Sequence, residues 1–212
     1  DNKYFNDNVA AIRADGLANC KDVANVPEVP YFLSVTRFLP RKNLVRLIRA
    51  YADYCGKTGK ENARPLVICG AGPEEPVIRQ EMDKFGLKAL VHLPGFVSYG
   101  EVPFWYAFAH AFVHPAVQEQ WGLVLNEAAA SGLPILASDT VGAAAELLKD
   151  GVNGFGFPPM EVDAISAAML RVDQLSPLGH AAMGAAGQEI VDDWGPGRFA
   201  EGLLGAGSTR AR

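Results

Sequence analysis

Short apolar runs alternate with longer amphipathic segments along the chain from residue 31 onward. In the segment 43–55, apolar residues stand at positions 44, 47, 48, 51, 52 and 55, which is the spacing of one face of a helix. The apolar runs have the length and the residue types of buried strands. This pattern predicts strands at 31–37, 65–70, 89–95, 110–115 and 133–139, and a short sixth strand at 155–158.

Helices are predicted between these strands. We expect a Ser98…Glu101 capping box to open one helix and a second helix to begin near Gly122. Pro103 lies about one turn into the first of these, so that helix should start later or kink. The remaining helices are predicted at 43–55, 74–86, 142–151 and 161–172.

Strands that alternate regularly with helices form βαβ units and therefore a parallel sheet. Because these connections are right-handed, we predict an α/β fold with a Rossmann-like, doubly wound parallel sheet over residues 30–175. The polar, Asn-rich opening 1–29 lacks an initiator Met and a signal pattern, and is expected to be an interdomain linker cut from a longer protein. Residues 176–205 are expected to be a C-terminal helical segment, and 206–212 a solvated tail.

Charge and cysteine content narrow the classes of function. Hydrophobic residues make up 49% and charged residues 20% of the chain, an ordinary globular balance. The net charge of −5 argues against a protein that binds nucleic acid through a general basic field, so an anionic ligand must be held locally. The chain has three cysteines, Cys20, Cys55 and Cys69, an odd number without a CxxC pair. This favours a reducing compartment and cysteines that pack in the core. We therefore expect a cytoplasmic protein.

Several polar segments follow the predicted strands directly, and in a parallel sheet ligands bind at the carboxyl ends of the strands. Arg37, Arg41 and Lys42 come after the first strand, and a Gly-Ala-Gly-Pro turn comes after the second. Together with the two acids discussed next, these groups suit a sugar nucleotide. Two plainer interpretations stay open: the turn lacks GxGxxG spacing and fits an ordinary αβ turn, and the cations fit a solvated helix start.

The stretch EQWGLVLNEAAASGLP, residues 119–134, carries two acids with seven residues between them. If a helix begins near Gly122, the free N–H groups of Gly122, Leu123 and Val124 form an anion site. Glu127 then lies more than a turn inside the helix, where it can accept hydrogen bonds from ribose. Glu119 lies before the helix and can meet the group beyond the phosphates. The run 123–125 is expected to pack the helix onto the sheet.

Other candidate side chains carry weaker signals. His92, His110 and His114 alternate with apolar residues and have no metal-ligand spacing, which favours structural roles. Ser131 and Ser138 have no GxSxG sequence around them, so a hydrolase triad is not expected.

The 119–134 stretch closely resembles the E-x7-E motif of retaining glycosyltransferases of the GT-B fold, in the large group 4. Further segments resemble this family in order and spacing, and the likeness covers about residues 1 to 172. Ala116 stands where the family often has Ser. The segments are DNKYF, VTRFLPRKNLVRLIRAY, LVICGAGP, VHLPGFVS, HAFVHPA and VGAAAELLKDGVNGFGFPP.

The resemblance implies that the chain is the C-terminal, donor-binding domain of such an enzyme. Arg37 and Lys42 would hold the donor's diphosphate, helped by the backbone N–H groups from Gly122 through Leu123 to Val124.

For the rest of the donor, the resemblance implies that Glu127 binds ribose and that Glu119 contacts hydroxyls of the sugar. The backbone at Phe96 and Val97 would meet the edge of the base. Transfer would retain the anomeric configuration and need neither a metal nor another cofactor.

The implied donor is a UDP-, GDP- or ADP-sugar, and the implied acceptor is a glycan or glycolipid bound by an N-terminal domain outside this sequence. No nucleic-acid partner is expected. Peripheral association of the full enzyme with the cytosolic face of a membrane stays open, and the isolated fragment is expected to be inactive.

Three alternatives remain. A nucleotide-sugar epimerase shares the fold but does not explain the paired motifs. A glycoside hydrolase uses two carboxylates but has no use for phosphate-binding cations. A nucleotide-binding module without chemistry would share every binding feature.

Overall fold

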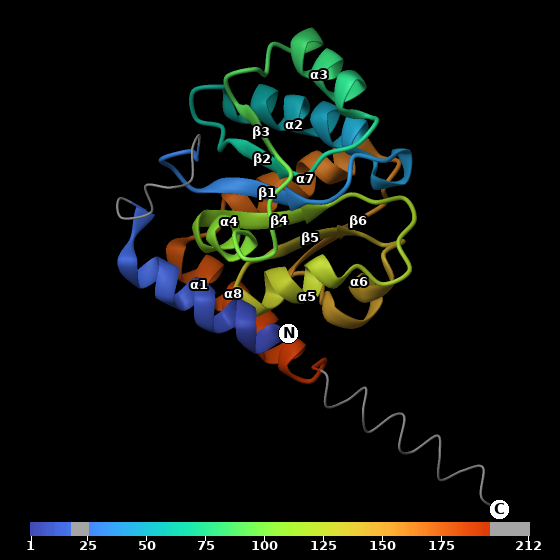
Figure 1. Cartoon of the computed structure of the whole chain (residues 1–212). Helices are drawn as coiled ribbons and strands as arrows, with labels where there is room; N and C mark the ends of the chain where they lie inside the picture. The colour runs from blue at the N-terminus through green and yellow to red at the C-terminus, as the bar shows by residue number, and fades with distance from the viewer. Residues whose placement is uncertain (18–25, 196–212) are drawn as a thin grey trace, which may run out of the picture.

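The computed structural model of the chain describes residues 1–17 and 26–195. In this part of the chain, six parallel strands form one sheet in the order β3-β2-β1-β4-β5-β6 (Figure 1). The predicted α/β, Rossmann-like doubly wound fold is confirmed. The strands are β1 (Tyr31–Val35), β2 (Leu66–Cys69), β3 (Val91–Gly95), β4 (Ala109–His114), β5 (Ile135–Ser138) and β6 (Gly154–Phe157).

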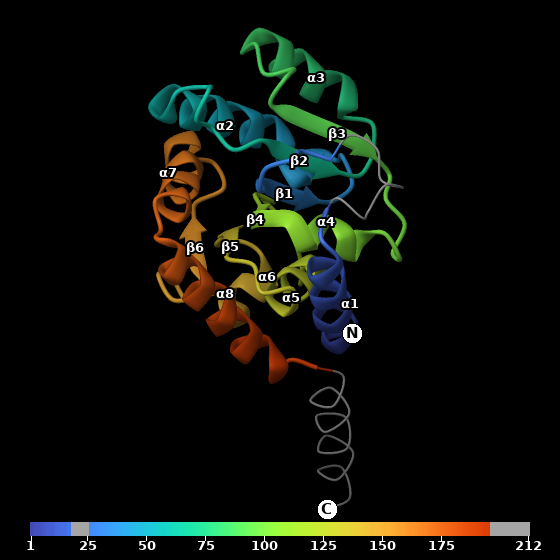
Figure 2. The ribbon, with the colours of Figure 1, turned by 90° about the vertical axis from the view of Figure 1, so that its left-hand side faces the viewer.

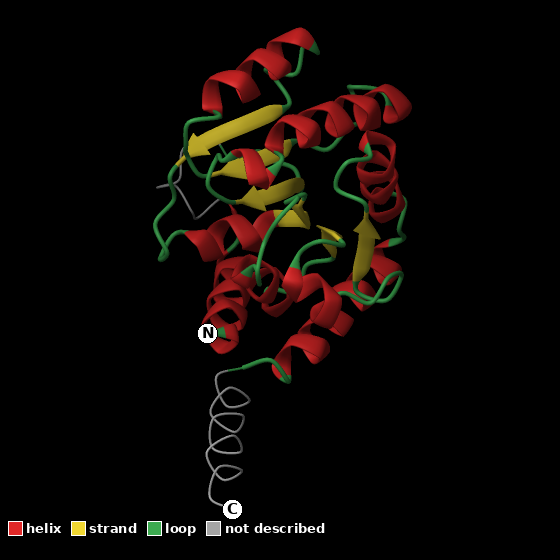
Figure 3. Cartoon of the chain, turned by 90° about the vertical axis from the view of Figure 1, so that its right-hand side faces the viewer, coloured by secondary structure: helices red, strands yellow, loops and turns green. Residues whose placement is uncertain are grey.

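Helices cover both faces of the sheet (Figures 1 to 3). One face carries α2 (Leu44–Thr58), α3 (Glu75–Lys84) and α7 (Val162–Asp173). The other face carries α1 (Asn2–Asp15), α4 (Val102–Phe108), α5 (Leu123–Ala130) and α6 (Gly142–Leu147), and α8 (Pro177–Asp192) packs against α5 and α6.

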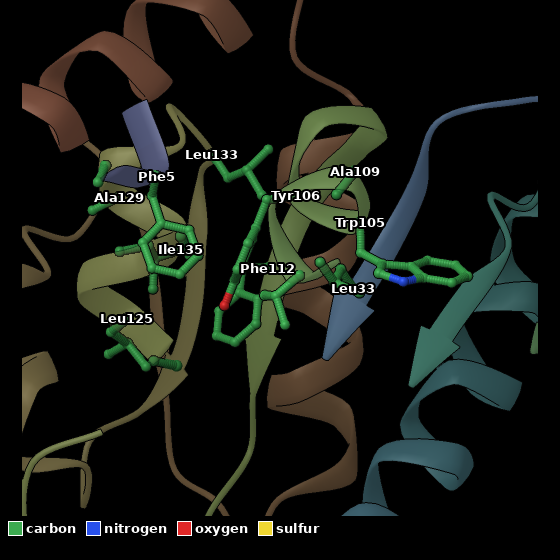
Figure 4. Close-up of a cluster of buried hydrophobic side chains, with 14 of the residues drawn as sticks. Phe5, Leu33, Trp105, Tyr106, Ala109, Phe112, Leu125, Ala129, Leu133 and Ile135 are labelled. Atoms are coloured by element: carbon green, nitrogen blue, oxygen red, sulfur yellow. The ribbon is translucent and has the colours of Figure 1, made fainter. Parts of the chain in front are cut away.

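The two faces of the sheet bury separate apolar clusters, which explains why the strands are almost continuous apolar runs. Phe32 of β1 points into the cluster under α2, whereas its neighbour Leu33 points into the cluster under α4 and α5. Figure 4 shows the cluster under α4 and α5, in which Phe5 of α1 lies beside Tyr106 and Phe112. The rings of Phe5 and Tyr106 meet edge to face at 5.6 Å. Helix α1 is therefore an integral part of the core.

This packing changes one expectation. The opening of the chain, expected as a linker, folds into the 14-residue helix α1 and buries Phe5 and Val9. Phe5, Val9 and the partly buried Ile12 have the i, i+4, i+7 spacing of a helix face, but the polar residues between them favour the linker interpretation. The division of the chain at residue 30 stays a prediction.

The other boundaries agree with the expected ones to within a few residues. Helix α4 starts at Val102, after the Ser98…Glu101 box, and Pro103 stands in its first turn, where its missing N–H costs nothing. Helix α6 ends at Leu147, earlier than expected. In the C-terminal segment α8 forms a helix, while the predictions for residues 196–212 and for Cys20 lie outside the described residues.

The glycine turn after β2 has a packing role. Gly70 has φ 138°, and a Cβ there would lie 1.8 Å from the carbonyl oxygen of Thr36. Glycine is therefore needed for the close approach of the loops after β1 and β2, which supports the plainer interpretation of this turn.

The loops after β1 and β4 are tied together at the point where the strand order reverses. After β1 the chain makes a short 3-10 turn, η2 (Pro40–Lys42), and then passes through Asn43 in the left-handed conformation, φ 61°. The Asn43 amide donates hydrogen bonds to the carbonyls of Pro115 (2.9 Å) and Pro159 (2.7 Å). The backbone N–H of Val117 donates to the carbonyl of Arg41 at 2.9 Å.

We expect Asn43→Gly to lower the free energy of unfolding by about 2 kcal/mol, because two buried carbonyls lose their donor while glycine keeps the left-handed backbone. Urea unfolding followed by circular dichroism measures this change. The control is Asn62→Ala, whose amide makes one hydrogen bond at an exposed position and should change stability by less than about 0.5 kcal/mol. Equal stability of the two variants would refute the structural role of Asn43.

Candidate functional site

A cavity of about 400 Å³ lies at the carboxyl ends of β1 and β4, the two neighbouring strands between which the strand order reverses. This is where doubly wound sheets bind their ligands. In Figure 1 the blue η2 turn and the loop that follows β4 lie side by side at the right of the molecule. The cavity is lined by Val35, Thr36, Arg37, Lys42, His114, Glu119, Gln120, Trp121, Gly122, Leu123 and Val124.

The structure thus brings together six of the nine residues that the sequence analysis expects to bind the donor, all except Phe96, Val97 and Glu127. Arg37 is exposed at the mouth of the cavity, whereas Lys42 is only 9% exposed. Burial, followed by the charges of Arg41 and Arg37, lowers the pKa of Lys42 to about 8. The two cations therefore differ: Arg37 is solvated, and Lys42 is largely withdrawn from water.

Lys42 forms an ion pair with the Glu119 carboxylate, a contact that the sequence does not predict. A carboxylate beside an ammonium favours the charged form of each. A phosphate that enters this cavity must compete with Glu119 for Lys42, so the expected phosphate-binding and sugar-binding side chains are coupled before any ligand binds.

The turn between Glu119 and α5 is fixed by the start of α6. The backbone N–H of Gly142 donates to the Glu119 carbonyl at 3.1 Å, and that of Ala143 donates to Trp121 at 2.8 Å. A Cβ at Gly142 would lie 1.9 Å from the carbonyl oxygen of Gln120. The turn therefore has little freedom to move away from the cavity.

Helix α5 begins directly after Gly122, as expected, and its N-terminus faces the cavity. Gly122 adopts φ 98°, ψ 67°, a left-handed conformation, and a Cβ there would lie 3.1 Å from a methyl group of Val141. Glycine is thus required by the backbone as well as by any close ligand. One expectation is wrong: Leu125 packs onto the sheet and Val124 does so partly, but Leu123 is 68% exposed.

Glu127 is the fifth residue of α5, just over one turn from the helix N-terminus, and lies outside the lining of this cavity. Its carboxylate accepts a hydrogen bond from the Tyr106 hydroxyl at 3.1 Å. Burial raises the pKa of Glu127, and the Tyr106 hydrogen bond acts against that rise. Tyr106 carries no motif, so this contact could not be found in the sequence.

Phe96 and Val97 follow β3 directly and also lie outside the cavity lining. The Phe96 side chain is 82% exposed, and Val97 packs partly against the core. Their backbone stands at the carboxyl edge of the sheet, where a base could approach. Nothing in the described contacts assigns them a ligand.

His114, expected to have a structural role, lines the cavity as the last residue of β4. Its side chain is 1% exposed, and neither ring nitrogen has a hydrogen-bond partner among the described residues. An unpaired buried polar group costs about 1–3 kcal/mol. Burial and the charge of Lys42 lower the pKa of His114 to about 3, so the ring is neutral. The one sequence signal is its place at a strand end, five residues before Glu119.

Two further features of the described residues concern metal ions and membranes. Within residues 1–17 and 26–195, no three His, Cys, Asp or Glu side chains cluster in a way that could hold a metal ion. None of the described helices combines the length and apolarity that crossing a bilayer requires.

Comparison with known proteins agrees with this geometry. The family model for glycosyl transferases group 1 matches residues 19–188. The O-antigen chain mannosyltransferase B of Escherichia coli is 32% identical over 142 residues, 66% of this chain and 36% of that protein. A GDP-mannose-dependent alpha-(1-6)-phosphatidylinositol monomannoside mannosyltransferase of Mycolicibacterium smegmatis is 29% identical over 85% of this chain and 48% of that protein. The chain spans less than half the length of either relative.

Solved structures show the same fold. The sucrose-phosphate synthase of Thermosynechococcus elongatus superposes with a TM-score of 0.76 and 26% identity, covering 94% of this chain and 49% of that one. The Anabaena protein HepE, solved with UDP and glucose, gives a TM-score of 0.72 at 23% identity over 93% of this chain and 52% of that one, a likeness of fold alone. With a family model that matches most of its length and a fold that agrees, the chain belongs to the glycosyl transferases of group 1.

Proposed function

We propose that this chain is the C-terminal, donor-binding half of a retaining, group 4 glycosyltransferase, which transfers a hexose from a nucleotide-diphosphate sugar to a hydroxyl acceptor. The observation that carries the proposal is the convergence of Arg37, Lys42 and the α5 N-terminus on one cavity, with Glu119 paired to Lys42. In a protein of net charge −5, this is a local concentration of anion-binding groups.

Each of these groups binds a different part of the donor. Arg37, Lys42 and the N–H groups from Gly122 to Val124 hold the diphosphate, while Glu127 holds ribose. Glu119 holds sugar hydroxyls, and the backbone at Phe96 and Val97 meets the base.

In the transfer, the bond from the anomeric carbon to the diphosphate oxygen breaks, and the acceptor oxygen bonds to that carbon. The electron pair leaves with the diphosphate, whose oxygen takes the acceptor's proton. The cations and the helix N-terminus stabilise the charge that develops on the diphosphate, and we propose that they do so without a metal ion or another cofactor.

Two similar proteins support a nucleotide-sugar donor. The Mycolicibacterium smegmatis mannosyltransferase is GDP-mannose-dependent, and HepE was solved with UDP and glucose. We propose that the acceptor, a glycan or a glycolipid, binds to an N-terminal domain of the whole protein. A lipid-linked acceptor would place that protein at the cytosolic face of a membrane.

Calorimetric titration of the chain with UDP, GDP and ADP, and with the matching nucleotide sugars, tests the proposal. Tight binding of one nucleotide supports it, and indifference to all of them contradicts it. Two alternatives, a nucleotide-sugar epimerase and a binding module without chemistry, are separated by product analysis of the whole protein: a glycoside, a free epimer or no product.

Arg37→Ala or Lys42→Ala should weaken binding of a nucleoside diphosphate by about tenfold or more, a monophosphate less, and an uncharged nucleoside hardly at all. The effect should shrink as salt rises, most strongly for the exposed Arg37. Calorimetry with the three ligands measures this order. Arg79→Ala, at an exposed ion pair on α3, is the control. Equal losses for diphosphate and nucleoside would mean damage to the fold.

Glu127→Ala should weaken nucleoside diphosphate binding by about tenfold to a hundredfold, because a hydrogen bond to a charged group is lost. Tyr106→Phe should have a smaller effect, since it leaves the carboxylate in place and removes only the hydroxyl that orients it. Glu189→Ala, at an exposed position on α8, is the matched control. An unchanged dissociation constant for Glu127→Ala would exclude the ribose role.

Glu119→Gln in the whole enzyme should lower kcat substantially, because the contact with the sugar is lost. Binding of the free nucleoside diphosphate should stay the same or tighten by up to about fivefold, since Lys42 is released from its ion pair. Steady-state kinetics and calorimetry measure the two effects. Parallel losses in both would reassign Glu119 to nucleotide binding or folding.

A further inference from the structure

The buried ring of His114 has no hydrogen-bond partner among the described residues, although it lines the same cavity as Lys42 and Glu119. Both ring nitrogens are inaccessible and unpaired in the described structure. The preceding residues of β4, Phe112 and Val113, are apolar and fully buried, so an apolar side chain fits this strand well. A histidine here is unfavourable for stability alone, which points to a use in the site.

That ring lies close to an oxygen of the side chain expected to hold the donor sugar. His114 Nε2 lies 3.6 Å from Glu119 Oε2, just beyond hydrogen-bond distance. The same Oε2 is bound by Lys42. A shift of less than about 1 Å would bring Nε2 into a hydrogen bond. Glu119 therefore lies between two donors, and among the described residues only Lys42 binds its carboxylate.

The protonation states fit such an exchange. The ring is neutral and carries one N–H, and an ionised carboxylate can only accept. The tautomer with its proton on Nε2 therefore matches Glu119. Because the ring brings no charge, it does not compete with Lys42 for a phosphate.

We infer that His114 is a positioning residue: its Nε2–H holds the Glu119 carboxylate when Lys42 turns to the diphosphate of the donor. This inference rests on the proposed function. In the free protein Lys42 holds Glu119. Once a diphosphate draws Lys42 away, Glu119 would be left in a largely buried position without a partner, and His114 takes it over. The remaining lone pairs of the Glu119 carboxylate then face the hydroxyls of the sugar.

The role predicts a loss that depends on the sugar. His114→Phe should weaken binding of UDP-glucose, GDP-mannose or ADP-glucose, whichever the wild-type chain binds, by about fivefold to tenfold. Binding of the corresponding nucleoside diphosphate should weaken less, by about twofold, because its diphosphate also draws Lys42 from Glu119 but it offers Glu119 no hydroxyl. The variant should also unfold at the same or a higher temperature, because an unpaired polar ring is removed. Calorimetry and thermal unfolding measure these effects.

Two amides serve as matched controls. The Gln amide nitrogen occupies nearly the place of Nε2, and the Asn amide nitrogen that of Nδ1. His114→Gln should restore binding of the nucleotide sugar, and His114→Asn should not.

A double-mutant cycle with Glu119→Ala decides whether His114 acts through Glu119. If it does, His114→Phe has no further effect in the Glu119→Ala chain. Additive losses, a loss shared equally by nucleotide and nucleotide sugar, or failure of the Gln variant to restore binding would each overturn the inference. A wild-type chain that binds no nucleotide would overturn the proposed function and this inference with it.

Discussion

The site depends on how the loops after β1 and β4 are joined. These strands are neighbours, but the chain leaves them in opposite directions, so the two loops diverge and leave an opening at the sheet edge. Asn43 spans that opening from one side, since its amide reaches carbonyls in the loops after β4 and β6. Its left-handed backbone ends the η2 turn, whose last residue is the buried Lys42. Asn43 therefore helps to hold the loop that carries the cation against the loop that leads to the acid.

That arrangement places charge where burial makes it unfavourable. Lys42 and Glu119 are both mostly removed from water, and each is tolerable only because the other is present. His114 adds a neutral polar group without a partner. A core filled with apolar residues would be more stable here, so the three side chains are best explained by a ligand whose own charges and hydroxyls complete their hydrogen bonds.

Most of the fold was predictable because the sheet is parallel and buried on both faces, so its strands appear as unbroken apolar runs between helices of regular period. Helix α1 was missed although Phe5, Val9 and Ile12 have helical spacing, because Asn and Asp residues, which are poor helix formers, are frequent in its first half. For the site, the sequence indicates which residues follow the strands, and six of them line one cavity. The sequence does not show which of these side chains contact one another. Lys42 and Glu119 are 77 positions apart, and Tyr106 and Glu127 are 21 positions apart, so only the folded chain brings each pair together.

The two acids of the E-x7-E stretch end up in different surroundings, and this difference fits the two different roles proposed for them. Glu119 stands before α5, against a cation and within reach of a second donor. Glu127 stands just over one turn inside α5, where its carboxylate accepts a hydrogen bond from the Tyr106 hydroxyl and burial raises its pKa. The first can exchange partners, whereas the second is held in one place. The free N–H groups at the helix N-terminus between them can donate hydrogen bonds to a negatively charged ligand. A molecule with hydroxyl groups at both ends and a diphosphate in the middle matches this order of groups.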